Sequence, residues 1–303
     1  MSKKDGPETT SDSTGVFSIK NLPSMEELTE FYQKYYFQDE NVRPKSYQSS
    51  YNENEIENIN LMNDLIFYSI ENIKPELKET KKFLLEIGVG EGFTLARALH
   101  HGWNVDGVDF GDHGIKKFNP ELLSNLQKGN TFEIIEKLVE QKKVYDVCII
   151  KNVLEHTINP NILLDNLKKL MKPEGILVII VPNDYSKLQL RALELGFVKD
   201  KFWLIPPQHL HYFNTENISA FIEKRGFSVL DMYSSFPIDF FLFHQNSNYV
   251  IDEASGKLAH QAQIELELLM ARDNLENYYH LCQSMAKCHV GRNVTIIVKK
   301  DSA

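Results

Sequence analysis

The chain has 303 residues, enough for one large domain or a domain with an appendage, and its 42% hydrophobic and 25% charged residues are typical of soluble globular proteins. A formal net charge of -9 argues against a nucleic-acid partner, because binding phosphates needs a basic surface. The three cysteines fit neither a disulfide framework nor a zinc site, and no apolar run approaches the roughly 20 residues of a membrane span. We therefore expect a cytoplasmic protein with no membrane partner.

Two regions precede the main domain. Residues 1–20 are polar and lack the apolar centre of a signal peptide, which predicts a disordered tail. A helix is predicted at residues 24–37, where Ser24 can cap it with Glu27 as the capping-box partner, and a second helix from about residue 54 to 73. Residues 21–80 should therefore form a helical cap.

Strands and helices alternate from Lys82 onward. This alternation predicts an α/β fold, with a parallel sheet covered by helices on both faces. A weaker strand is expected near residues 127–130, before a clear helix. The four apolar runs that predict strands are residues 83–88, 103–110, 145–150 and 175–182, and helices should begin near residues 93, 115, 132, 161 and 185.

Two further strands are expected towards the end of the chain, one after a turn at Gly226 and one in the final "GRNVTIIVKK". Residues 236–290 form a helical, aromatic insertion between them. Within it, apolar residues recur at four- and three-residue steps, which predicts one stripe on a helix that either packs in the core or forms the seam of a homodimer. The stripe consists of Ile264, Leu268, Ala271, Leu275, Tyr278 and Cys282.

The stretch "LLEIGVGEGF" places Gly88, Gly90 and Gly92 between a predicted strand and a predicted helix. This order is typical of loops that bind nucleotide-type ligands. The spacing is tighter than the dinucleotide fingerprint, and the carboxylate of Glu86 would repel a pyrophosphate but help to hold a cation. Asp109 ends the next strand, where a carboxylate can accept from both ribose hydroxyls.

Together, the Glu-x-Gly-x-Gly-x-Gly element and Asp109 resemble the class I S-adenosylmethionine-dependent methyltransferases. "YDVCIIKNVLEH" resembles the fourth-strand motif of that family, and "LLDNLKKLMKPEGILVIIVPN" resembles its following helix and fifth strand. The resemblance spans residues 82–299. It implies a Rossmann-like domain at residues 81–303, with a mostly parallel seven-stranded sheet and an antiparallel last strand.

The same resemblance implies S-adenosyl-L-methionine as cofactor and S-adenosyl-L-homocysteine as product. The glycines would approach the methionine part, Asp109 would hold the ribose, and Phe110 would pack on the adenine. Asn130 stands where many members have an acid that meets the adenine amino group. The cofactor-binding residues expected from it are Glu86, Gly88, Gly90, Gly92, Asp109, Phe110, Asn130, Asn152 and Val153.

Candidate catalytic residues lie where the fourth and fifth predicted strands end. "NVLEH" resembles the Glu-x-x-Glu-His element of quinone-type O-methyltransferases, and His156 is a candidate base. Asn152 replaces the first acid of that element, so no metal is expected. Alternatively, Glu155 and His156 cap and pack the next helix. Asp184 is a second candidate, and Asn183 a substrate contact, unless they serve as helix cap and turn residue.

The stretch "WLIPPQHLHYFN" contains the preferred bases, His209 and His211. One residue separates them, so on an extended segment they would share a face, and a histidine of near-neutral pKa suits proton removal. The alternative is a buried histidine that only makes hydrogen bonds. Further candidate substrate contacts are Trp203, Tyr212, Phe240 and Tyr249.

The motifs "PNDYS", "PPQHLHYF", "FPIDFF" and "GRNVTIIVKK" resemble those of a bacterial subgroup of small-molecule methyltransferases that is linked to surface-polysaccharide and secondary metabolism. We therefore expect a methyltransferase that acts on a small polar, sugar-like acceptor, by O-methylation of a sugar or nucleotide-linked sugar. The alternatives are methylation of nitrogen or carbon, and a scaffold protein that binds the cofactor without turnover.

Overall fold

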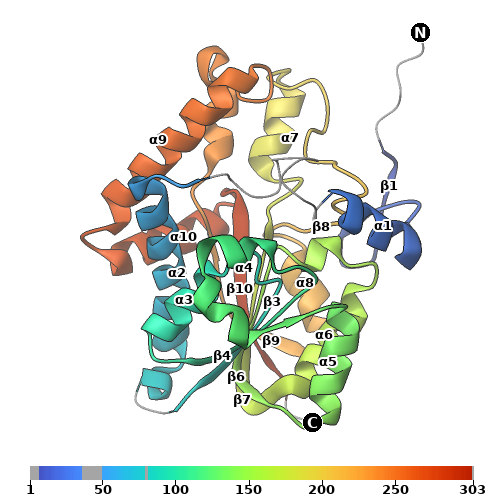
Figure 1. The fold of residues 1–303 in the computed structure, drawn as a ribbon. Coiled ribbons are helices and arrows are strands. Elements are labelled where there is room, and N and C mark those ends of the chain that lie inside the picture. Colours follow the sequence, from blue (N-terminus) through green and yellow to red (C-terminus); the bar gives the residue numbers. More distant parts are fainter. Residues whose placement is uncertain (1–6, 36–49, 79–80, 302–303) are drawn as a thin grey trace.

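The computed structural model describes residues 7–35, 50–78 and 81–301, and a seven-stranded sheet lies at its centre (Figure 1). The strand order is β5-β4-β3-β6-β7-β10-β9. Neighbours from β5 to β7 pair in parallel, whereas β10 is antiparallel to both β7 and β9. This confirms the expected fold with an antiparallel last strand. The strands are β3 (Phe83–Ile87), β4 (Asn104–Asp109), β5 (Leu126–Lys128), β6 (Tyr145–Lys151), β7 (Met171–Pro182), β9 (Phe227–Ser234) and β10 (Asn293–Lys300).

Helices cover both faces of the sheet, which explains why the central strands are almost continuously apolar. On one face α5 (Thr131–Glu140), α6 (Pro160–Leu170) and α8 (Ile218–Glu223) pack on the sheet (Figure 1). On the other face lie α2, α3, α4 and α10. Their bounds are α2 (Glu53–Ile73), α3 (Phe93–His100), α4 (His113–Phe118) and α10 (Leu275–Lys287), and α7 (Lys187–Glu194) lies beyond the carboxyl end of β7.

A small second sheet corrects the expected disordered tail. β1 (Thr9–Ser11) and β2 (Phe17–Ile19) form a hairpin, and β2 also pairs with β8 (His211–Tyr212). Val16 is buried in the main core, and the Phe17 ring stacks on Tyr185 with centroids 4.2 Å apart. The prediction was wrong for these residues because two apolar side chains and an accepting strand edge suffice to order a polar segment. Residues 1–6 lie outside the described residues.

The two N-terminal helices occupy different places. α1 (Met25–Tyr35) contributes Leu28 to a cluster with Ile19 of the hairpin, whereas α2 packs against α3 and α9 (Glu253–Ala271). Asn52 caps α2 and forms a capping box with Glu55. The predicted end of the first helix, residues 36–37, lies outside the described residues.

The insertion contains two helices where one was expected. α9 (Glu253–Ala271) ends before α10 begins, and the Asn274 side chain caps α10 by accepting from Asn277 N. The prediction of one helix was wrong because this polar break does not interrupt the apolar spacing. The stripe residues are buried or, for Leu275, partly buried within the chain, which confirms core packing. Short 3-10 helices also occur: η1 (Pro75–Lys78), η2 (Pro120–Asn125), η3 (Leu154–His156), η4 (Ile238–Phe243) and η5 (Gln245–Ser247).

Candidate active site

The glycine loop joins β3 to α3 through three left-handed residues. Gly88, Gly90 and Gly92 have φ angles of 80°, 57° and 86°, a conformation that side chains disfavour. A Cβ added at Gly88 would lie 2.3 Å from Cγ2 of Val153, which follows β6. The loop backbone therefore packs directly against the segment after β6, with no room for a side chain at Gly88.

Asp109 links the loop to the end of β4. Its Oδ2 accepts from Gly90 N at 2.9 Å and its Oδ1 from Gly111 N at 2.8 Å. Burial raises the pKa of this carboxyl, although both hydrogen bonds oppose the change. A carboxylate offers about four acceptor positions, so Asp109 can still accept from a ribose hydroxyl while backbone N–H groups, including that of Phe110, hold it against the loop.

Glu86 lies in β3 with 1% of its surface exposed. Burial raises its pKa to about 8, and the ammonium of Lys151 only partly opposes this. The carboxyl is therefore mostly protonated at neutral pH, so its role in holding a cation is weaker than the sequence suggests.

The other expected cofactor residues follow the ends of β4, β5 and β6. Phe110 follows β4 and is 39% exposed, and Asn152 is exposed with a φ of 52°. Asn130 Oδ1 caps α5 by accepting from Phe132 N and Glu133 N. An adenine amino group would have to share that oxygen with the cap, so this assignment stays a prediction with a competing structural role.

A second group of polar residues lies where β6 and β7 end and β10 begins. Asp184 is 1% exposed, and its Oδ1 accepts from Arg292 Nη1 at 3.0 Å. Its Oδ2 lies 3.6 Å from His209 Nδ1, beyond hydrogen-bonding distance. Burial lowers the pKa of the Arg292 guanidinium, but Asp184 and Asp239 outweigh that effect and raise it. Asp184 thus lies between a fixed cation and a histidine.

His156 lies beside His209, with ring centroids 4.8 Å apart. Its Nδ1 is 2.6 Å from the carbonyl oxygen of Gln208, which can only accept, so Nδ1 carries the proton. Burial, followed by the nearby His209, lowers the pKa of His156 to about 3. His156 is therefore a neutral imidazole and a weak base at neutral pH.

Glu155, His156 and His209 could hold a metal ion, because one ligand atom from each lies within 4.8 Å of the others. Neither Glu155 oxygen has a hydrogen-bond partner among the described residues, and burial raises its pKa to about 8. The bond from His156 Nδ1 to a carbonyl is typical of histidines that bind metals through the other nitrogen. The expectation of no metal stays a prediction.

The two histidines of the loop after Trp203 contact different neighbours. His211 lies in β8, and its Nδ1 is 2.8 Å from Ser18 Oγ of the N-terminal hairpin. Burial lowers its pKa. Only His209 reaches Asp184 and His156, so the arrangement favours His209 as the base.

The expected substrate contacts divide into buried and accessible residues. Trp203 and Tyr212 are buried together, and the Tyr212 hydroxyl donates to His209 O. The Asn183 amide donates to Gly291 O and accepts from Thr215 N. Phe240 is 51% exposed, and the Tyr249 hydroxyl donates to Asp239. Their contacts with substrate stay predictions, with structural roles evident for the buried three.

Sequence reasoning missed several residues of these two groups. Arg292 directly precedes the last strand and Lys151 directly precedes Asn152, so position beside a predicted strand end was the available signal. The Tyr51 hydroxyl donates to Glu91 Oε2 of the glycine loop at 2.6 Å, a contact across 40 positions that has no sequence signal.

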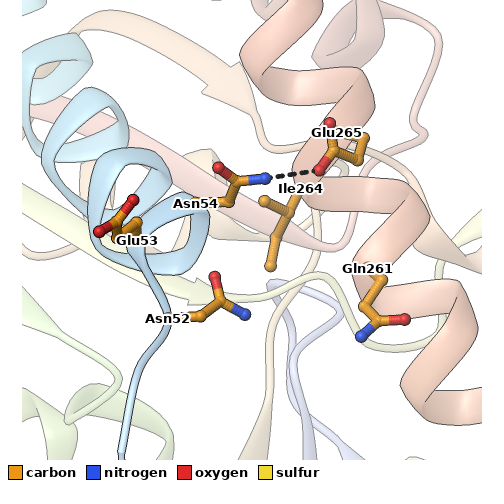
Figure 2. Close-up of a pocket in the computed structure, with 6 residues that line it drawn as sticks. All are labelled: Asn52, Glu53, Asn54, Gln261, Ile264 and Glu265. Atoms are coloured by element: carbon orange, nitrogen blue, oxygen red, sulfur yellow. Dashed lines mark hydrogen bonds between the residues drawn. The ribbon is translucent and has the colours of Figure 1, made fainter.

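A separate groove of about 610 Å³ lies between the start of α2 and α9 (Figure 2). Asn54 Nδ2 donates to Glu265 Oε1 across it at 2.7 Å. No residue of the glycine loop or of the His209 group lines this groove. Its lining residues are Asn52, Glu53, Asn54, Gln261, Ile264 and Glu265.

None of the helices in the described part of the chain combines the length and apolar character needed to cross a lipid bilayer.

A family model described as a methyltransferase domain matches residues 62–231.

Curated relatives include the ubiquinone biosynthesis O-methyltransferases of Rickettsia bellii (strain OSU 85-389) and Rickettsia prowazekii (strain Madrid E), each 26% identical to this chain. The alignments cover 70% and 72% of this chain and 80% and 77% of those proteins, respectively. Among solved structures, a SAM dependent methyltransferase from Archaeoglobus fulgidus is 21% identical, with a TM-score of 0.48, over 78% of this chain and 94% of that one.

Proposed function

This chain belongs to the methyltransferase domain family, and from that premise we propose that it methylates a hydroxyl oxygen of a small polyhydroxylated acceptor. The methyl donor is S-adenosylmethionine, as in the Archaeoglobus fulgidus protein named above. The curated relatives are named as O-methyltransferases, which supports oxygen as the methylated atom.

The residues around the glycine loop fit this donor. Gly88 lets the loop backbone pack directly on the segment after β6, because a Cβ there would lie 2.3 Å from Cγ2 of Val153. Asp109 can still accept from a ribose hydroxyl. Phe110, partly exposed at the end of β4, offers a ring for the adenine to pack on.

When bound, the donor supplies an electrophilic methyl group on a positively charged sulfur. The protein must hold the acceptor oxygen in line with that methyl, exclude water and remove the hydroxyl proton. His209 is the base in this proposal. Its Nδ1 faces Asp184, so the nitrogen that receives the acceptor proton is Nε2, and the Asp184 carboxylate stabilises the resulting imidazolium.

The observation that carries the proposal is the placement of His209 between Asp184 and the neutral His156. Arg292 donates to Asp184 in an ion pair, and the low pKa of His156 prevents it from competing for the proton. Enclosed carboxyl groups of Glu155 and Asp239 nearby suit an acceptor that offers several hydroxyl donors.

The acceptor could be a sugar-type molecule, as the sequence motifs suggest, or a phenolic one. The test incubates the protein with isotope-labelled donor and two pools, sugar nucleotides and dihydroxylated phenols, and identifies the methylated atom in the product by mass spectrometry and NMR. A product methylated on nitrogen or carbon would contradict the proposal.

The His209→Ala variant should lose about 100-fold or more in kcat, the usual contribution of a general base, with unchanged donor affinity. The exposed His100 gives a matched control, because His100→Ala removes an imidazole away from both groups. Full activity of His209→Ala would rule out its role as base.

A further inference from the structure

Lys151 is the last residue of β6 and lies beside the glycine loop. β3 and β6 pair in parallel with Ile87 opposite Ile150, so Lys151 comes next to Gly88. The carbonyl oxygen of Lys151 is 3.9 Å from the position that a Cβ of Gly88 would take. Lys151 therefore lies at the edge of the sheet where the proposed donor binds.

The side chain of Lys151 shares a face of the sheet with Glu86. Side chains alternate along a strand, and Val147 and Ile149 of β6 pack in the same cluster as Leu84 of β3. Continuing that alternation places Lys151 and Glu86 on this face too. Both Glu86 and Glu91 act electrostatically on the Lys151 ammonium.

Neither acid is an ion-pair partner of Lys151. Within the described part of the chain, Lys151 makes no ion pair within 4.0 Å and no side-chain hydrogen bond, although it is partly buried. Glu86 is mostly protonated at neutral pH, and Glu91 Oε2 already accepts from Tyr51. An ammonium that is partly removed from water without a partner is unfavourable, and an anionic ligand would relieve that cost.

We propose that the Lys151 ammonium binds the carboxylate of the methionine part of the donor. The inference rests on the proposed function, since it concerns how the donor is held. The resemblance to class I methyltransferases implies that the glycines approach that same part of the donor, and its carboxylate is the anionic group available there. An anionic group on the acceptor is the other source of the same chemistry.

Calorimetry of ligand binding to the whole protein distinguishes the carboxylate of the donor from an anionic group on the acceptor as the partner of Lys151. The ligands are S-adenosylmethionine, its decarboxylated analogue and 5′-methylthioadenosine, which lacks the amino-acid part. Wild-type protein should bind S-adenosylmethionine about 10- to 100-fold more tightly than the decarboxylated analogue, the range for a charge-assisted hydrogen bond. Lys151→Met should reduce this preference to about threefold or less, and Lys151→Arg should keep most of it because the charge remains.

Binding of 5′-methylthioadenosine reports whether each variant is folded, and it should be unchanged in Lys151→Met. Lys143→Met is the matched control, because Lys143 is exposed just before the start of β6. If wild-type protein shows no preference for the carboxylate, or if Lys151→Met retains it, the inference is wrong. If wild-type protein binds neither S-adenosylmethionine nor S-adenosylhomocysteine, the proposed function fails instead.

Discussion

Replacing Glu86 by glutamine should change how the stability of the protein depends on pH. The buried carboxyl has an ordinary pKa of 4.5 that burial raises to about 8 in the folded protein. Between these values the unfolded chain releases the proton while the folded protein keeps it. The unfolded state then binds fewer protons, so the free energy of unfolding falls as pH rises through this range.

The difference between 4.5 and about 8 corresponds to about 4 to 5 kcal/mol at 1.36 kcal/mol per pKa unit. That is an upper value, because the effective dielectric of protein interiors is higher than that of dry protein. We expect about 2 kcal/mol or more. The Glu86→Gln variant has no proton to release, so its stability relative to wild type should rise by this amount from pH 5 to pH 8.

Urea unfolding of both proteins at pH 5, 6, 7 and 8 measures this difference. Glutamine also changes the hydrogen bonds of the site, but that effect is the same at every pH and cancels in the comparison. Glu121→Gln, at an exposed position, should give one constant difference. A Glu86→Gln difference that is equal at pH 5 and pH 8 would refute the argument that burial controls this carboxyl.

Three further predictions concern other parts of the molecule. Gly88→Ala should weaken binding of S-adenosylmethionine about 10-fold or more by calorimetry, because strain and a clash add, whereas Gly102→Ala, with a similar φ of 76° and nothing within 4 Å, should bind normally. Asp184→Asn removes the charge that pairs with Arg292 and should lower the free energy of unfolding by about 3 kcal/mol, measured by urea unfolding. Asp165→Asn, in a more exposed ion pair, should cost less than about 1 kcal/mol, and similar costs for the two variants would contradict this prediction. When the native protein is treated with iodoacetamide, mass spectrometry should find the label on Cys288 alone, because burial raises the pKa of the Cys148 and Cys282 thiols to about 12. Label on Cys148 or Cys282 would contradict the packing described.

The sheet could be predicted from the sequence because parallel strands that are buried on both faces consist of continuous runs of apolar residues. β5 is the instructive exception. It is only three residues long and lies at the edge of the sheet, so few of its side chains need to be apolar and its sequence signal is weak. The hairpin of β1 and β2 was missed for a related reason, since its stability depends on contacts with distant residues such as Tyr185.

Among the residues of the candidate site, the sequence predicted mainly those that lie at or directly after the end of a predicted strand. Asp109 and the glycine loop fall at such positions, and the structure brings them together through the bond from Gly90 N. The partners of His209 could not be read from the sequence, because Asp184 and His156 come from separate segments. The spacing of His209 and His211 suggested a shared role, but β8 pairing with the hairpin gives His211 different neighbours.

The hairpin at the start of the chain also bears on the order in which the protein assembles. Ser18 and His211 are 193 positions apart, so their contact can form only after more than half of the polypeptide has left the ribosome. The glycine loop and Asp109 are joined by a contact across only 19 positions. The contact between the glycine loop and Asp109 can thus form early in synthesis, whereas the loop that contains His209 gains the support of Ser18 only when these two distant segments meet.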